Sequence, residues 1–142
     1  MIYQLDTDVD PAAVSDAVRA GIRQADHEGV RPRDWQNISL SLRDPQGALV
    51  GGLYGATMWS WLMIDGLWVA TGQRGQGLGR RLLLASEEIA INRDCIGSWL
   101  GTFDFQAKEF YERHGYSVFA TLSDFPPGHK HFHLRKHFVV PK

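Results

Sequence analysis

The chain has 142 residues, 44% of them hydrophobic and 22% charged, which is the size and composition of one domain with its own core. Its 15 lysines and arginines and 16 acidic residues give a net charge of -1, which argues against a general nucleic-acid-binding protein. The one cysteine, Cys95, cannot form an intramolecular disulfide, so we expect a cytoplasmic location.

No membrane segment is expected. Residues 45–64 are uncharged and long enough to cross a bilayer, but they include four glycines and Pro45, which favour turns and strands. The residues after Met1 lack the basic and apolar pattern of a signal peptide.

The first third of the chain predicts one helix with uncertain flanks. Met1–Leu5 reads as a short strand, and Asp10 is a plausible N-cap for a helix from Pro11 to about Asp26. Apolar residues recur on one stripe of that helix: Ala13, Val14, Ala17, Val18 and Ile22. Residues 31–35 are ambiguous and compatible with a helical turn.

The remaining chain alternates strands and helices. The expected strands are residues 37–43, 48–59, 61–69, 95–102, 116–122 and 132–139. A helix is expected directly after Gly79, and a second one over residues 104–114 with Asp104 as N-cap and Gly115 just after its end. This order predicts an α/β fold, with a mixed sheet and helices packed on its faces, in a single domain over residues 1–142.

A glycine-rich segment, Arg74-Gly75-Gln76-Gly77-Leu78-Gly79-Arg80, links a predicted strand to a helix. Glycines let the backbone approach a ligand, and the first turn of a helix offers unpaired N–H groups, so this segment predicts a phosphate or pyrophosphate site. A P-loop needs Lys-Ser/Thr after Gly77, and a Rossmann loop needs Gly or Ala at position 80, so neither motif fits. Residues 66–86 carry three arginines and no acidic residue, which points to a compact anionic ligand.

Two motifs carry a resemblance to a known superfamily. Arg74-x-x-Gly77-x-Gly79, preceded by Leu67-Trp68-Val69, resembles the loop of the Gcn5-related N-acetyltransferase (GNAT) superfamily that holds the pyrophosphate of acetyl-CoA. About 30 residues later, Tyr111-x-x-x-Gly115-Tyr116 resembles the second signature of the same superfamily. The resemblance covers nearly the whole chain and implies a mostly antiparallel central sheet.

The same resemblance implies roles for individual residues. Residues 74–80 would hold the pyrophosphate, Leu67, Trp68 and Val69 would pair with the pantetheine amides, and Gln106 would face the pantetheine arm. The Val69 N–H would meet the acetyl carbonyl. Tyr111 would lie beside the coenzyme A sulfur, where a phenol with its ordinary pKa is protonated at pH 7 and can protonate the departing thiolate.

The general base is less well defined by the sequence. Alternation along residues 61–69 places Asp65 on an otherwise apolar face with Leu67 and Val69, and a carboxylate in such a place suits a base. Asp65 is therefore the leading candidate, although it could instead cap a neighbouring backbone group. His129, acting directly or through water, stays open as an alternative.

The histidines near the C-terminus also suggest a metal site, because His129, His131 and His133 alternate along one predicted strand. No acidic residue follows Asp124 and no cysteine is near, so we favour a solvated edge strand and expect no metal. Met58–Met63, together with Trp35 and Phe125, could line a pocket for the acceptor, although a core role is the simpler interpretation.

These observations predict an N-acetyltransferase that moves the acetyl group of acetyl-CoA to a primary amine of a small-molecule acceptor, by direct attack in a ternary complex. The alternative is a non-catalytic domain that binds acetyl-CoA as a sensor. We expect no nucleic-acid or membrane partner, and the resemblance suggests a homodimer.

Overall fold

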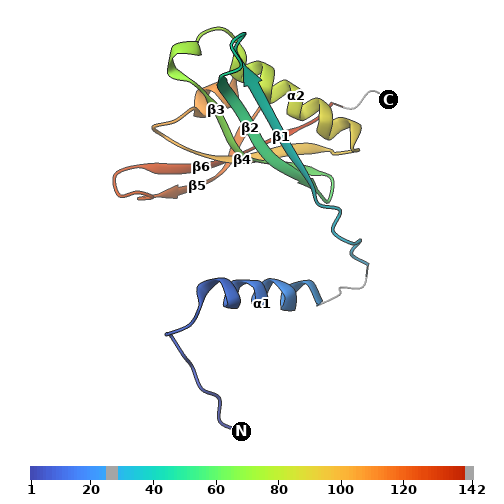
Figure 1. The fold of residues 1–142 in the computed structure, drawn as a ribbon, viewed down its shortest axis with the longest axis vertical. Coiled ribbons are helices and arrows are strands. Elements are labelled where there is room, and N and C mark those ends of the chain that lie inside the picture. Colours follow the sequence, from blue (N-terminus) through green and yellow to red (C-terminus); the bar gives the residue numbers. More distant parts are fainter. Residues whose placement is uncertain (25–28, 140–142) are drawn as a thin grey trace. The chain divides into compact units, whose positions relative to one another are not determined.

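The computed structural model describes residues 1–24 and 29–139, and the chain separates into two units, Met1–Pro32 and Arg33–Lys142 (Figure 1). The single domain expected over residues 1–142 stays a prediction. No helix within the described residues is long and apolar enough to cross a membrane.

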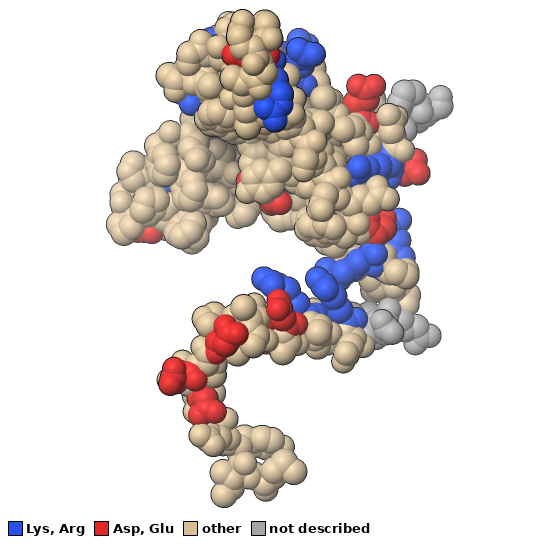
Figure 2. All heavy atoms as spheres, viewed as in Figure 1, with Lys and Arg blue, Asp and Glu red and all other residues tan. Residues whose placement is uncertain are grey.

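The first unit is built on helix α1, Pro11–Gln24. The helix begins as predicted, because the Oδ1 atom of Asp10 accepts the N–H of Ala12 at 3.2 Å; its predicted end at Asp26 lies outside the described residues. Three acidic residues, Asp6, Asp8 and Asp10, precede the helix, and Arg23 lies in its last turn, which suits the helix dipole (Figure 2). The apolar stripe is present, but no residue of α1 is buried.

Two predictions near the N-terminus are wrong. Met1–Leu5 forms no strand, because no neighbouring strand pairs with its backbone. Residues 31–35 form no helical turn, in keeping with Pro32, which disfavours helical geometry at the residue before it.

The second unit contains a six-stranded sheet, and all six strands lie within about two residues of their predicted bounds. The strands are β1 Gln36–Arg43, β2 Leu49–Met58, β3 Trp61–Val69, β4 Gly97–Phe103, β5 Ser117–Ser123 and β6 Lys130–His137. They lie in the order β1-β2-β3-β4-β6-β5, and the only parallel pair among them is β3 with β4. The prediction of a mixed, mostly antiparallel sheet is therefore confirmed. The histidine-bearing strand β6 lies between β4 and β5, so its prediction as an edge strand is wrong.

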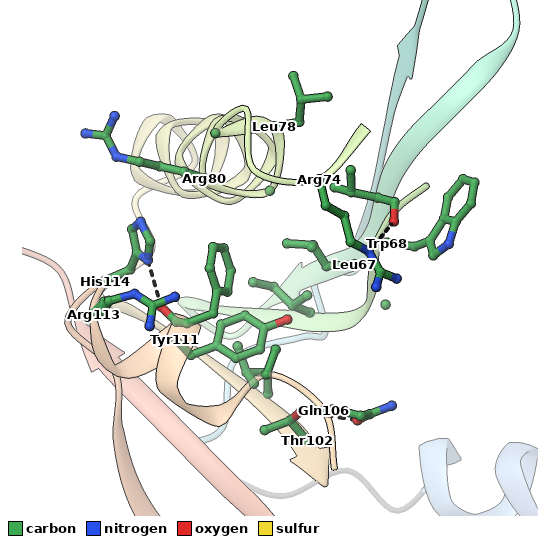
Figure 3. Close-up of a pocket in the computed structure, with 18 of the residues that line it drawn as sticks. Leu67, Trp68, Arg74, Leu78, Arg80, Thr102, Gln106, Tyr111, Arg113 and His114 are labelled. Carbon is green, nitrogen blue, oxygen red and sulfur yellow. Dashed lines mark hydrogen bonds between the residues drawn. The ribbon is translucent and has the colours of Figure 1, made fainter. Parts of the chain in front are cut away.

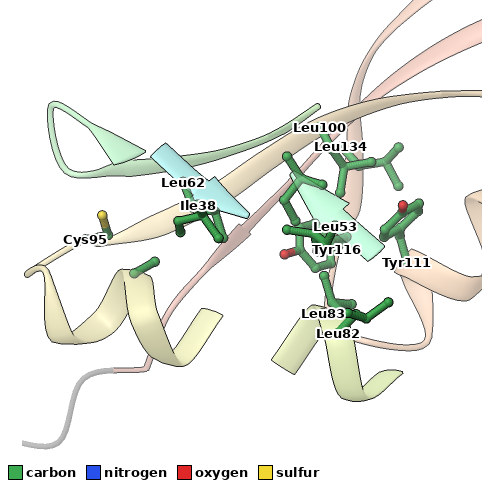
Figure 4. Packing of buried hydrophobic residues seen from close by; sticks show 12 residues of the cluster. Ile38, Leu53, Leu62, Leu82, Leu83, Cys95, Leu100, Tyr111, Tyr116 and Leu134 are labelled. Carbon is green, nitrogen blue, oxygen red and sulfur yellow. The ribbon is translucent and has the colours of Figure 1, made fainter. Parts of the chain in front are cut away.

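The helices of this unit build the core on one face of the sheet. The 3-10 helix η1, Thr71–Gln73, leads into α2, Leu78–Asn92, and α3 is a short helix, Lys108–Glu112. Leucines of α2 pack against the apolar residues of β1 to β4, and Leu134 of β6 joins them (Figure 4). The buried Cys95 lies in the same cluster.

The helix predicted over residues 104–114 is shorter than expected. Its N-cap is Ala107, and the carboxylate of Asp104 instead accepts the N–H of Lys130 at 2.8 Å and lies 2.9 Å from the Nδ1 atom of His129. Asp104 therefore ties the end of β4 to the start of β6, and its N-cap role is wrong. Gly115 follows the helix with φ of 94°, as predicted.

A β-bulge changes which residues of β3 share a face. The pairing with β2 shifts between Tyr54 and Gly55, which leaves Asp65 as the extra residue of β3. Leu62 and Ile64 before the bulge, and Leu67 and Val69 after it, therefore all belong to the apolar core. The simple alternation expected along residues 61–69 is wrong from Asp65 onward.

Candidate active site

A cavity of about 960 Å³ lies where β3 and β4 separate (Figure 3). The two strands pair with each other from Trp61–Gly97 to Ile64–Leu100. Beyond that point β3 continues to Val69 and β4 to Phe103, but the two no longer pair with each other. Residues of both strands, of the loop before α2, of the first turn of α2 and of α3 line the space between them. The splayed strand ends thus create the cavity.

Twelve of the thirteen residues predicted for the site line this cavity. They are Asp65, Leu67, Trp68, Val69, Arg74, Gly75, Gly77, Leu78, Gly79, Arg80, Gln106 and Tyr111. The exception is Gln76, whose side-chain amide donates to Gln73 at 3.4 Å. The structure therefore brings together residues that are up to 46 positions apart, from Asp65 to Tyr111, around one space.

One end of the cavity is suited to an anion. Gly77 is the N-cap of α2 with φ of 75°, and no side chain caps the helix. The first helical bond within the chain joins the N–H of Arg81 to the carbonyl of Gly77, so the three preceding N–H groups have no helical partner. With Arg74 and Arg80 beside them, these groups form a cationic N-terminal site of the kind that binds phosphate groups.

Along the side of the cavity, the edge of β3 presents backbone groups. Ala70 donates its N–H to Val50 of β2, so alternation directs the N–H and C=O groups of Leu67 and Val69 the other way, toward the space left by β4. The Val69 carbonyl accepts the Nε–H of Arg74 at 3.1 Å, which holds this arginine against the strand (Figure 3). A bound chain of amides could pair with this edge as a further strand would.

Tyr111 is the buried hydroxyl of the site. Its side chain is only 7% exposed, and burial raises the pKa of its phenol above 10.0. The ring is held edge-on against Phe110 at 5.1 Å and Tyr116 at 5.8 Å between ring centres. Figure 3 shows its hydroxyl directed away from Arg113 toward the middle of the cavity. Such a phenol remains protonated and can act as a proton donor.

A buried polar network supports the ring behind Tyr111. The hydroxyl of Tyr116 donates to Glu87 at 2.8 Å, and the same carboxylate accepts from Lys136 at 2.7 Å. Burial, together with the charge of Glu87, raises the pKa of Tyr116 well above its usual range. The network joins α2 to β6 and to the start of β5, and so fixes the wall on which Tyr111 packs.

Gln106 presents its amide NH₂ group to the cavity. Its Oε1 atom accepts from the hydroxyl of Thr102 at 3.2 Å and from the N–H of Phe103 at 3.1 Å. With its oxygen occupied, the exposed side chain has its two N–H donors left for a ligand (Figure 3). The contact of Gln106 with a pantetheine arm stays a prediction.

Among the predicted site residues, Asp65 has surroundings that differ most from those expected from the sequence. It is the one carboxylate among the described residues that line the cavity, but it is exposed at the β-bulge rather than placed on an apolar face. Its position allows it to attract a cation at the mouth of the cavity.

Several lining residues were not predicted. Arg113 and His114 follow Tyr111 on the turn after α3 and add positive charge on the side of Arg80 (Figure 3). Phe110 packs so close to α2 that a Cβ on Gly79 would lie 3.4 Å from its ring. Arg113 and His114 could have been predicted from the sequence. They are basic residues within the Tyr111–Gly115 motif, and the family resemblance implies that this motif lies beside the ligand.

The face of the sheet turned away from α2, here called the far face, carries a cluster of aromatic and imidazole rings. Phe103 lies against Phe105, Phe125 and His131 at 5.1, 5.6 and 4.5 Å between ring centres. Gly101 and Phe105 of this region also line the cavity, so the cavity opens toward the cluster.

The acceptor wall predicted at Met58–Met63 does not line the cavity. Trp59 lies under the guanidinium of Arg33 at 4.6 Å, and Trp61 packs edge-on against His137. Across residues 1–24 and 29–139, no group of three or more His, Cys, Asp or Glu side chains is placed to hold a metal ion.

Comparison with known proteins agrees with this geometry. Residues 9–116 match the model of the acetyltransferase (GNAT) family. A blasticidin-S acetyltransferase of Streptomyces morookaense is 50% identical over 84 residues, which cover 58% of this chain and 62% of that protein. The aligned part thus spans less than two thirds of that relative.

Two further proteins resemble the chain over more of their length. An acetyltransferase of Agrobacterium fabrum (strain C58 / ATCC 33970) is 32% identical over 105 residues, covering 74% of this chain and 77% of that protein. The crystal structure of an acetyltransferase from Bacillus cereus ATCC 14579 has a TM-score of 0.81 at 29% identity and covers 97% of this chain and 98% of its own.

Proposed function

Because the chain belongs to the acetyltransferase (GNAT) family, we propose that it transfers the acetyl group of acetyl-CoA to a primary amine of a small molecule. The observation that carries the proposal is the cavity between the splayed ends of β3 and β4, which combines a cationic helix N-terminus with a buried phenol. The family match also spans α1, which supports one catalytic domain over residues 1–142.

Acetyl-CoA fits the cavity in one direction. Its pyrophosphate would accept from the N–H groups of Leu78, Gly79 and Arg80 and pair with the guanidinium groups of the loop. Its pantetheine amides would pair with the exposed backbone edge of Leu67–Val69, and Gln106 would donate to one of their carbonyls. The acetyl group would then reach the region of Tyr111, where the N–H of Val69 is a candidate donor to its carbonyl oxygen.

The reaction follows from these positions. The neutral amine attacks the acetyl carbon, a C–N bond forms, and the C–S bond to coenzyme A breaks. Tyr111 gives its proton to the departing thiolate sulfur and regains one from the nitrogen that has just been acylated. Asp65, at the mouth of the cavity, draws in the ammonium form of the acceptor and is the carboxylate within reach to take its proton.

The relatives suggest which acceptor to test first. One of them is named for blasticidin S, and the aromatic cluster on the far face offers flat apolar walls against which an acceptor could pack. Blasticidin S is therefore the first acceptor for a panel of primary amines. We also propose that the chain acts in the cytoplasm and as a homodimer.

The function is tested by measuring thiol release from acetyl-CoA with this amine panel, beside calorimetric binding of acetyl-CoA. We expect acetyl-CoA to bind and at least one amine to release coenzyme A in proportion to acetylated product. Binding without turnover on any amine would favour the sensor function. A protein that does not bind acetyl-CoA would contradict both functions.

A further inference from the structure

One histidine of the far face lies directly over the strand that lines the cavity. His131 of β6 is paired in register with Phe103 of β4, but its ring leans over Gly101. A Cβ added to Gly101 would lie 2.7 Å from the Cε1 atom of His131 and 2.8 Å from its Nε2 atom. The absence of a side chain at Gly101 therefore makes room for the Nε2 edge of the imidazole, beside a residue that lines the cavity.

The imidazole of His131 is held in place without using its nitrogens. Phe103, Phe125 and His133 surround it at 4.5, 5.7 and 4.8 Å between ring centres, each close to edge-on. Within the described part of the chain, neither of its ring nitrogens makes a hydrogen bond. Three aromatic neighbours thus fix the ring while a lone pair is left for a substrate.

The surroundings of His131 favour its neutral form. Burial lowers the pKa of this imidazole below 6.5, and the nearby His133 lowers it further. Three other titratable groups lie on the strand and loop packed around it. His129 and Asp104 pair with each other, and Lys130 is the residue between His129 and His131. Across the splay, the titratable group on β3 is Asp65. Within the described residues none of these groups forms an ion pair with His131, so no charged partner offsets the lowering of its pKa.

We propose that His131 accepts the proton that the acceptor's ammonium group must lose before its nitrogen attacks acetyl-CoA. The inference rests on the proposed function and gives the proton to His131 rather than to Asp65. The N–H bond of the ammonium breaks, its electron pair stays on nitrogen as the nucleophile, and the proton passes to the Nε2 atom of His131. The imidazolium then releases the proton to solvent, which balances the net loss of one proton per acetyl group transferred.

This role explains why Gly101 and the ring cluster occur together. The acceptor would approach from the far face, meet the phenylalanine walls, and place its amine between His131 and the acetyl group. Acetyl-CoA would occupy the α2 side of the splay, next to Tyr111. The two proton-transfer groups would then act from opposite faces of the sheet.

The test is the pH dependence of kcat/KM for His131→Asn, with blasticidin S or the fastest amine of the panel as acceptor. We expect a loss of about 100-fold at pH 7, which is the lower end of general-base effects. The loss should shrink to less than about tenfold as the pH approaches the acceptor amine's own pKa, because the amine then needs no base. Added imidazole should restore part of the activity of His131→Ala.

Two further variants separate proton transfer from structure. His137→Asn changes a histidine of the same strand that packs on Trp61 away from the cavity, and it should keep wild-type kcat/KM. Gly101→Ala should lower kcat/KM by displacing the imidazole, but should cost little when it is added to His131→Ala.

Three results would overturn the inference. His131→Asn could match the wild type, it could lose the same factor at every pH, or the pH-dependent loss could appear in Asp65→Asn instead. In each case the wild-type enzyme still releases thiol, so the proposed function survives. If the wild type acetylates no amine, the proposed function and this inference fail together.

Discussion

The two sides of the cavity are built in different ways. The α2 side uses one continuous segment, Leu67–Arg80, and its groups are mostly backbone N–H and C=O groups placed by glycines and a helix N-terminus. The far side uses side chains from β4, the loop before β6, and β6 itself. A site made of backbone suits the invariant part of a reaction, whereas a site made of side chains can be changed residue by residue.

This difference predicts that mutations on the two sides should affect different kinetic and binding constants. Changes on the α2 side should alter acetyl-CoA binding for every acceptor. Changes on the far side should alter the acceptor KM and leave acetyl-CoA binding as it was. Tyr111 adjoins the α2 side but acts only on the departing sulfur, so its loss should alter neither affinity.

Among changes next to the acetyl-CoA path, the largest expected effect is on the chemical step alone. Tyr111→Phe removes the proton donor but keeps the ring packed against Phe110 and Tyr116. We expect kcat to fall at least about tenfold, with an unchanged dissociation constant for acetyl-CoA. Steady-state kinetics and calorimetry measure the two values. An unchanged kcat would remove Tyr111 from the mechanism.

Removing a cation from the α2 side should be the next largest effect. Arg80→Gln, or Arg74→Gln, should weaken acetyl-CoA binding about tenfold at low salt, because a charge-assisted hydrogen bond is worth about 1.5–3 kcal/mol. The acceptor KM should not change. Arg81→Gln is the matched control, because Arg81 lies in the same helical turn but does not line the cavity. Equal losses for Arg80 and Arg81 would mean that only overall charge matters.

The sequence predicted the α2 side of the cavity better than the far side. The Arg74–Arg80 loop and the Tyr111 motif supplied seven of the twelve predicted lining residues, because both are short segments whose spacing resembles that of a known family. The bulge at Asp65 could not be predicted, since alternation assumes a strand without extra residues. That one insertion reversed the face expected for Leu67 and Val69.

The far side depends on contacts that no local pattern contains. His131 reaches Gly101 only because β6 pairs with β4 inside the sheet, and strand order is set by the whole fold. For the same reason, Asp104 could be mistaken for an N-cap, because its partners His129 and Lys130 lie 25 and 26 residues away. Residues 58–63, considered as an acceptor wall beside the simpler core role, do not line the cavity.

A smaller effect should come from the ring cluster of the far side. Phe105→Leu and Phe125→Leu should raise the acceptor KM about two- to fivefold, in line with about 0.5–1 kcal/mol for a lost aromatic contact, and leave acetyl-CoA binding unchanged. Phe119→Leu is the control, since its ring contacts His133 and Arg135 rather than Phe103. Weaker acetyl-CoA binding in the Phe105 or Phe125 variant would contradict the division into sides.

The smallest expected effect concerns the pH dependence of kcat, which should not reveal a titration of Tyr111 at moderately alkaline pH. Burial raises the pKa of Tyr111 above its ordinary value, so its phenol keeps its proton to a higher pH than a solvent-exposed tyrosine does. We therefore expect kcat to show no decline between pH 8 and pH 10 that disappears in Tyr111→Phe. A decline in that range that the variant abolishes would mean that the phenol titrates normally.

The most direct test of the whole account is a crystal structure with coenzyme A bound. We predict that the pyrophosphate lies on the N–H groups of residues 78–80 and that the sulfur lies within hydrogen-bond distance of the Tyr111 hydroxyl. The path from the sulfur to the far face should pass Gly101. Coenzyme A bound with its sulfur away from Tyr111, or on the far face, would contradict the assignment of the two sides.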